Sequence, residues 1–200
     1  MKLLIFDVGG VLRDTSEAMN EGFRKGFRRS GLEYPFSKDE IWHLRGIGKY
    51  NNSLNAVTAL LAVYKAGAKL GEIIERSDAE SFLDRLVEKS ISPDDREMID
   101  YIRRVYKEYS NSEEAGKHTT IYPDVREVLS YLHSRGFRLA VFTNASRKSV
   151  VRDLQDIGMD RFSMIVSGED VEKKKPSGEG IVRICSELGI QTNETAYVGD

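Results

Sequence analysis

The sequence has 200 residues, 40% of them hydrophobic, which is enough for a buried core and suits one domain that carries a large insertion. Its net charge is −2 with both signs mixed, so no basic surface is expected for nucleic acid or for an anionic membrane. The single cysteine, Cys185, excludes an internal disulfide and suits a reducing compartment, which makes the cytoplasm the expected location.

The first predicted element is a strand over residues 3–6. These four residues are all apolar and do not alternate with polar ones, which is typical of a parallel strand covered on both faces. The run ends at Asp7, and Gly9 and Gly10 follow closely. Nothing in the chain approaches the roughly 18 consecutive apolar residues that a membrane-spanning helix needs.

Residues 15–115 show one helical pattern after another and no convincing strand, which predicts an all-helical insertion. Residues Ser77-Asp78-Ala79-Glu80 match a capping box, so a helix is expected to begin there. The polar stretch 111–117 is expected to be the linker that returns to the rest of the fold.

From about residue 121 onward, strands and helices alternate. Apolar runs at 139–142, 164–166 and 196–198 predict strands, and the helical patterns between them end before Gly136, Gly158 and Gly189. The expected fold is α/β, a Rossmann-like parallel sheet with helices on both faces, built from residues 1–14 and 116–200 around the insertion 15–115.

Polar residues follow each predicted strand at its carboxyl end, where ligands bind in open α/β sheets. Two carboxylates, a hydroxyl, an amide and an ammonium are expected to meet there: Asp7, Thr143 and Asn144, a lysine of Lys173-Lys174-Lys175-Pro176, and Asp200. Carboxylate oxygens suit Mg²⁺, and the other groups suit the oxygens of a phosphoryl group. The sequence therefore predicts a site for a phosphate and a divalent cation.

In this arrangement the sequence resembles the haloacid dehalogenase-like (HAD) hydrolase superfamily, in its phosphatase-type members with a helical cap inserted after the first strand. The resemblance covers the whole chain and rests on four short motifs in the family's order: Phe6-Asp7-Val8-Gly9-Gly10-Val11-Leu12, Val141-Phe142-Thr143-Asn144, Lys175-Pro176 and Tyr197-Val198-Gly199-Asp200. Each motif alone is weak, whereas their order and the cap-sized insertion together are specific.

The resemblance implies an aspartyl-phosphate mechanism. Asp7 would be the nucleophile; as an ionised carboxylate it needs no general base. Thr143 would bind the phosphoryl oxygens with support from Asn144 and from backbone amides after Asp7, Gly10 among them. Lys175 would neutralise charge on both the nucleophile and the phosphoryl group.

The resemblance also implies a Mg²⁺ site formed by Asp7, the backbone carbonyl of Gly9, and Asp200. Phosphatases of the family carry a second Asp, a general acid and base, at the position that Gly9 occupies here. Its loss removes a contribution of roughly 10² to 10⁴ in rate. The family pattern also continues beyond Asp200, and a chain that stops there is expected to bind Mg²⁺ more weakly.

Several functions are compatible with these motifs. The first is hydrolysis of small phosphate monoesters, of the phosphoglycolate or sugar-phosphate type. The alternative is a catalytically impaired protein that binds a phosphorylated metabolite or partner. Phosphomutase and dehalogenase activities are weaker alternatives, because a mutase also needs an acid and base at position 9 and because Gly199-Asp200 resembles the phosphatase pattern.

Substrate choice is expected to depend on the helical cap. Residues 43–49 join two helical patterns, and Arg45 and Lys49 resemble the cationic positions that meet the distal part of the substrate in relatives of this type. Two cations there would favour an anionic or polyhydroxylated small molecule. The predicted partner is therefore a small phosphorylated metabolite, and the sequence leaves the oligomeric state open.

Overall fold

The protein is described by a computed structural model that covers residues 1–200. The chain divides into two compact units: residues 1–15 with 111–200 form an α/β unit, and residues 16–110 form a helical unit. No helix combines the length and apolar character needed to cross a membrane.

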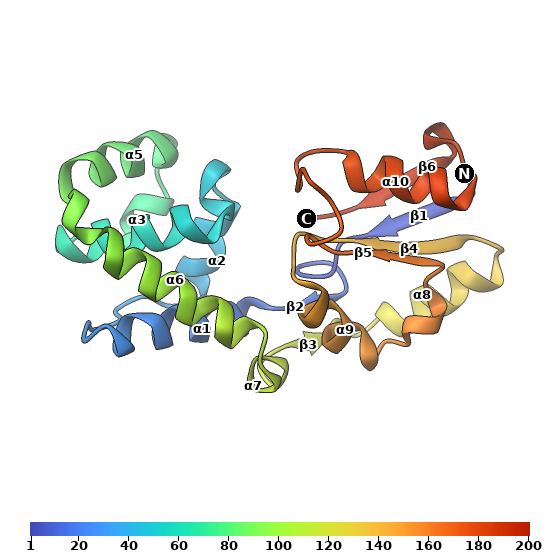
Figure 1. Ribbon diagram of the computed structural model, residues 1–200, viewed down its shortest axis with the longest axis horizontal. Coiled ribbons are helices and arrows are strands. Elements are labelled where there is room, and N and C mark those ends of the chain that lie inside the picture. The colour runs from blue at the N-terminus through green and yellow to red at the C-terminus, as the bar shows by residue number, and fades with distance from the viewer. The chain divides into compact units, whose positions relative to one another are not determined.

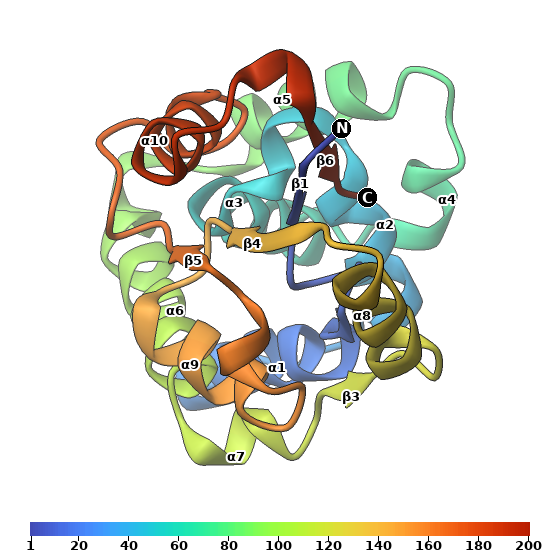
Figure 2. The ribbon, with the colours of Figure 1, turned by 90° about the vertical axis from the view of Figure 1, so that its right-hand side faces the viewer.

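The α/β unit is built on a four-stranded parallel sheet in the order β5-β4-β1-β6, which confirms the predicted fold class. The strands are β1 (Leu3–Phe6), β4 (Arg138–Phe142), β5 (Met164–Val166) and β6 (Thr195–Val198). The register places Ile5 beside Ala140 on one side and Tyr197 on the other. Figure 2 shows β1 between β4 and β6.

Helices cover both faces of this sheet (Figure 1): α8 (Val125–Ser134) and α9 (Arg147–Gln155) on one face, and α10 (Glu179–Leu188) on the other. Alternate residues of β1 explain this arrangement, because Leu4 and Phe6 pack in the core under α8 and α9 whereas Leu3 and Ile5 pack in the core under α10. The unbroken apolar run of β1 therefore reflects burial on both faces.

Glycines terminate helices in this unit as the sequence predicts. Gly136, Gly158 and Gly189 all have positive φ values, of 82°, 95° and 64°. Gly189 directly caps α10 in the left-handed conformation. Cys185 is buried in the core beneath α10, which suits a packing residue.

Short elements complete the α/β unit. Strands β2 (Arg13–Asp14) and β3 (Thr120–Ile121) pair antiparallel, and the 3-10 helices η3 (Met159–Arg161) and η4 (Thr192–Glu194) precede β5 and β6. One helical turn, α7 (Glu113–Gly116), lies in the stretch expected to be a plain linker. Its Ala115 is buried, so this segment is packed rather than extended.

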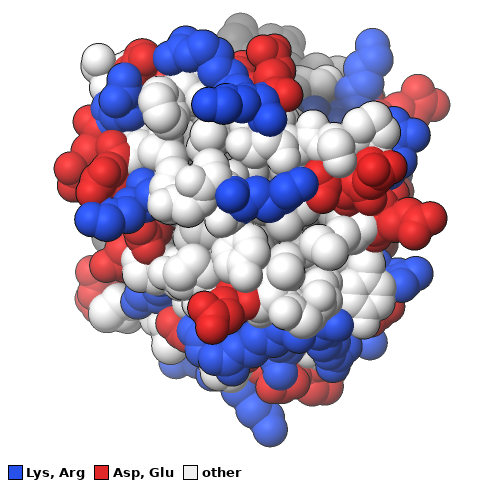
Figure 3. All heavy atoms as spheres, turned by 90° about the vertical axis from the view of Figure 1, so that its left-hand side faces the viewer, with Lys and Arg blue, Asp and Glu red and all other residues white.

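The helical unit consists of helices only: α1 (Ser16–Arg29), α2 (Lys38–Gly46), η1 (Gly48–Asn51), α3 (Ser53–Lys65), α4 (Leu70–Ile74), α5 (Ala79–Ser90), η2 (Pro93–Asp95) and α6 (Arg96–Ser110). It has its own core, in which α3 is buried most completely. Phe23 of α1 stacks on Tyr106 of α6 with ring centroids 4.3 Å apart. Its face in Figure 3 carries both signs of charge, with uncharged areas between the charged side chains.

The capping box predicted at Ser77 is wrong. Helix α5 begins at Ala79 after Asp78, and no side chain caps it. The Glu80 carboxylate instead accepts a hydrogen bond from the Lys49 N–H at 3.2 Å, and Asp78 pairs with Arg76 and Arg85. Glu80 is therefore used by a segment 31 residues away, and Asp78 by two arginines near it in the chain.

Candidate active site

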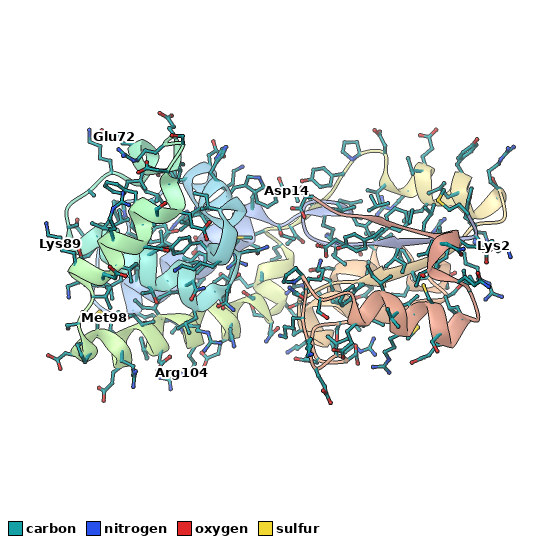
Figure 4. All side chains as sticks on the ribbon, turned by 90° about the horizontal axis from the view of Figure 1, so that it is seen from above. Lys2, Asp14, Glu72, Lys89, Met98 and Arg104 are labelled. Carbon is teal, nitrogen blue, oxygen red and sulfur yellow. The ribbon has the colours of Figure 1, made fainter.

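Asp7 lies immediately after β1, at the carboxyl end of the sheet. Lys2 and Asp14, labelled in Figure 4, mark the two ends of the α/β unit, and the strands run toward the end where Asp14 lies. The Asp7 N–H donates to the Val198 carbonyl of β6 at 2.9 Å, and the Val8 N–H donates to Asp7 Oδ1 at 2.7 Å. These bonds fix both the backbone and the carboxylate, whose side chain is only 14% exposed.

The Lys175 ammonium forms a short ion pair with Asp7 Oδ2, although the two residues are 168 positions apart in the chain. It also donates to the Tyr197 hydroxyl at 2.8 Å. Burial alone would lower the pKa of Lys175, but the charge of Asp7 and the hydrogen bond to it outweigh burial and raise the pKa. Lys175 is therefore a cation held against the predicted nucleophile.

Asn144, just beyond β4, binds the backbone of Lys175. Its Oδ1 accepts from the Lys175 N–H at 2.8 Å, and its Nδ2 donates to the Lys175 carbonyl at 3.2 Å. The neighbouring Thr143 is buried, and its hydroxyl accepts from the Ala145 N–H at 3.4 Å. Asn144 thus anchors the loop that carries Lys175, and Thr143 forms no hydrogen bond to Asp7 or Lys175.

The turn after Asp7 uses most of its own backbone donors. Gly10 has a φ of 79°, and its N–H donates to the Arg13 carbonyl at 2.8 Å. The N–H of Gly9 has no hydrogen-bond partner, and the Gly9 carbonyl accepts none. Of the two glycines, Gly9 therefore presents the free backbone donor and acceptor beside Asp7.

The candidate metal ligands are all oxygen donors. Burial raises the pKa of Tyr197, and the charges of Asp7 and Asp200 raise it further against the lowering effect of Lys175. No group of three His, Cys, Asp or Glu side chains is arranged to hold a metal ion. Two carboxylates with one carbonyl nevertheless suit Mg²⁺, which keeps several waters and binds through few protein oxygens.

The two predicted substrate cations, Arg45 and Lys49, belong to the helical unit. Lys49 Nζ forms an ion pair with Asp84 Oδ1 at 2.9 Å. Arg45 reaches Asn51 Oδ1 at 3.4 Å, and its buried Nε and Nη1 have no hydrogen-bond partner. Two Arg45 nitrogens are therefore unpaired but closed off from solvent, whereas the charge of Lys49 is balanced by Asp84.

Sequence reasoning missed two residues that contact Lys175. The Lys175 Nζ lies 5.5 Å from the centre of the Tyr197 ring and 5.8 Å from the centre of the Phe142 ring. Both aromatic residues belong to the quoted motifs, and strand alternation could have placed them on the α10 face. The register places Tyr197 beside Ile5 of β1, and the contacts of Lys175 show that both rings lie at the ion pair with Asp7.

The parallel sheet, the helical insertion and the motifs at the strand ends together are typical of one class of hydrolases. The chain belongs to the haloacid dehalogenase-like hydrolase family, whose model matches residues 1–200. It is 40% identical to a phosphoglycolate phosphatase of Chromobacterium violaceum over 89 residues, which are 44% of this chain and 40% of that protein. It is 32% identical to pyrophosphatase PpaX of Halalkalibacterium halodurans over 107 residues, 53% of this chain and 49% of that protein.

The matched segments thus span less than half the length of both relatives. Among solved structures, a haloacid dehalogenase-like family hydrolase from Streptococcus pneumoniae superposes with a TM-score of 0.63 at 15% identity. That match covers 100% of this chain and 76% of the other. At this level of identity the likeness shows the fold alone.

Proposed function

We propose that the protein is a Mg²⁺-dependent phosphatase that hydrolyses small phosphate monoesters through an aspartyl phosphate on Asp7. The observation that carries the proposal is the ion pair between Asp7 and Lys175, which joins a strand-end carboxylate to a cation from a distant loop. Membership of the family and the likeness to a phosphoglycolate phosphatase support the same chemistry.

In the first step an Asp7 oxygen forms a bond to phosphorus while the bond to the ester oxygen breaks. The leaving alkoxide takes its proton from water, because Gly9 supplies no acid. Lys175 offsets the charge of the carboxylate and of the incoming phosphoryl group, and the free N–H of Gly9 is a candidate donor to a phosphoryl oxygen. In the second step water attacks phosphorus, the bond to Asp7 breaks, and phosphate leaves.

Asp7, the Gly9 carbonyl and Asp200 would hold Mg²⁺. When bound, the cation offsets the repulsion between the Asp7 carboxylate and the phosphate. Thr143 remains the candidate side-chain donor to the phosphoryl group, and Asn144 acts through the Lys175 backbone. The N–H of Gly10 already donates to the Arg13 carbonyl, so Gly10 is the weaker candidate. The helical unit serves as the cap, and Arg45 and Lys49 are its candidate cations for an anionic substrate.

The test is a panel of phosphate monoesters, including phosphoglycolate and sugar phosphates, assayed with Mg²⁺ and with a chelator. We expect phosphate release that needs the metal, and Asp7→Asn should abolish it because an amide is a poor nucleophile. If no member of the panel releases phosphate, or if Asp7→Asn keeps full activity, the proposal is wrong.

Gly9 favours a second candidate function, the binding of a phosphorylated metabolite without turnover. The backbone donor and acceptor of Gly9 remain free for a ligand while the carboxylate needed for proton transfer is absent. Calorimetry that detects tight binding by a chain with no turnover would support this function. Measurable turnover that Asp7→Asn abolishes would exclude it.

A further inference from the structure

The Lys175 ammonium has more partners than its predicted role requires. Besides the ion pair with Asp7, it donates to the Tyr197 hydroxyl at 2.8 Å and lies over the rings of Tyr197 and Phe142. The Lys175 side chain is 21% exposed. One cation is thus surrounded by a carboxylate, a phenol hydroxyl and two ring faces. These groups come from β4, β6 and the residue after β1, which are neighbours in the sheet.

The two rings are held in place by glycines. A Cβ added to Gly180 of α10 would overlap the Phe142 ring, and a Cβ added to Gly199 would overlap the Tyr197 ring. Phe142 is itself fully buried, whereas Tyr197 is 37% exposed. The rings therefore have close neighbours that limit their movement, and Tyr197 is the one that can be changed without opening the core.

The hydroxyl of Tyr197 matters for the direction of the ammonium. A lysine side chain has three N–H donors on a flexible stem and loses rotamer entropy when it is fixed. Asp7 takes one donor and Tyr197 takes another. With two donors fixed, the direction of the third is fixed too, and it is the one left for a phosphoryl oxygen.

We propose that Tyr197, supported by the Phe142 ring, is a positioning residue that holds the Lys175 ammonium beside Asp7 before a substrate binds. Both parts of the tyrosine contribute: the hydroxyl accepts a hydrogen bond and the ring face attracts the cation. The effect of Tyr197 on turnover rests on the proposed phosphatase function. Its effect on the position of the Lys175 ammonium does not depend on that function.

The first test measures how freely Lys175 leaves these partners. Purified protein is acylated with a lysine-directed ester, and the labelling rate of Lys175 is resolved by fragment mass spectrometry. The neighbouring Lys173 and Lys174, which are exposed, serve as internal standards. We expect Tyr197→Phe to label Lys175 several-fold faster than wild type, and Tyr197→Leu faster still, because the leucine also lacks the ring.

Tyr131→Phe is the matched control, because Tyr131 is 60% exposed on α8 and its ring lies near Arg135 rather than Lys175. It should label like wild type. An unchanged Lys175 rate in Tyr197→Phe would overturn the role of the hydroxyl. Equal rates in Tyr197→Phe and Tyr197→Leu would overturn the role of the ring.

The second test separates kcat from KM with the best substrate of the ester panel. Because the ammonium acts on charge that develops in the transition state, kcat of Tyr197→Phe should fall roughly tenfold, with a smaller change in KM. A kcat within twofold of wild type would overturn the proposal for catalysis. If wild type has no turnover, the phosphatase function fails while the labelling test still decides whether Tyr197 holds Lys175.

Discussion

At the scale of single residues, Gly9 is the position where the site departs from the usual phosphatase pattern. Its φ is not positive, so its backbone does not require glycine. A Cβ built there would meet only the Thr15 side chain, with Thr15 Oγ1 nearest at 3.1 Å, so this hydroxyl must give by a few tenths of an ångström. No backbone atom beyond its chain neighbours approaches the added Cβ within 4 Å, so a side chain at position 9 has to displace only this one side chain.

Gly9→Asp should raise the turnover of a phosphate monoester. The new carboxylate would lie beside Asp7 and could protonate the leaving group, an effect worth between about 10² and 10⁴ in rate when the geometry is right. The measurement is kcat with Mg²⁺ present. Gly9→Asn is the control, because it adds the same volume and cannot transfer a proton, so an equal gain in both variants would contradict the prediction.

The wild-type protein should accumulate its phosphoenzyme during turnover. Attack by Asp7 needs no general base, but activation of the hydrolytic water does, so the second step is slowed more than the first. Rapid quenching followed by peptide mass spectrometry should find a phosphoryl group on the peptide that contains Asp7. In Gly9→Asp the adduct should decrease, and its absence from wild type during turnover would count against this order of steps.

At the scale of elements, the segment between β5 and α10 determines where Lys175 lies. Asp170 closes its first turn by accepting from the Ser167 N–H at 2.7 Å and from the Ser167 hydroxyl at 2.6 Å. Glu179 fixes the middle by accepting from the N–H groups of Glu172 and Lys173. This segment is thus held by carboxylates at two points before Asn144 binds Lys175.

Asp170→Asn should destabilise this segment at pH 7 and should do so less in acid. Burial alone would raise the pKa of Asp170, but the hydrogen bonds from Ser167 and the charge of Arg147 outweigh it, and the pKa is lowered. A carboxylate with a lowered pKa contributes stability above its unfolded-state pKa and loses it as the pH falls through the folded-state pKa. We expect a loss of about 1–2 kcal/mol at pH 7.

Hydrogen exchange of peptides from β5 and α10 in graded urea measures this loss. The difference between Asp170→Asn and wild type should shrink as the pH falls below the ordinary aspartate pKa, where the unfolded chain takes up a proton, and should vanish below the lowered folded-state pKa. Asp160→Asn is the control, since Asp160 is an exposed aspartate of the same unit with no ion pair. A difference that stays constant between pH 7 and pH 3 would show that the charge of Asp170 is not responsible.

The elements that the sequence predicts well are those set by local pattern. The strands at Leu3–Phe6 and Met164–Val166 have the expected bounds because apolar runs and flanking turns define them. The start of α5 could not be predicted, because Glu80 bonds to Lys49, which is 31 residues away. Local caps are reliable only where no distant group competes for the same side chain.

The same distinction applies to the site. Asp7 could be named from sequence because ligands gather at the carboxyl ends of parallel strands, and Lys175 because Lys175-Pro176 resembles a motif of the family. The contact between Lys175 and Tyr197 could not be predicted. It depends on the register of β6 against β1 and on the path of the segment before α10. Sequence therefore predicts which chemical groups reach the edge of the sheet, but not which of them pair.

At the scale of the whole molecule, the two units have separate cores. Every residue of the helical core lies between Phe23 and Ile102, and the two cores of the α/β unit contain none of these residues. Leu60 of α3 and Leu139 of β4 are equivalent probes, because they are 0% and 1% exposed in their respective cores. Either substitution to alanine should cost about 2–5 kcal/mol.

Leu60→Ala and Leu139→Ala should therefore each weaken only their own unit. Trp42 of α2 is the only tryptophan, so its fluorescence in urea follows the helical unit, and hydrogen exchange of β1 and β4 peptides follows the α/β unit. Leu60→Ala should lower the midpoint of the fluorescence transition and leave β1 and β4 protected, and Leu139→Ala should do the reverse. If either variant weakens both units equally, the chain unfolds as a single cooperative unit, because independent cores would transmit no such loss.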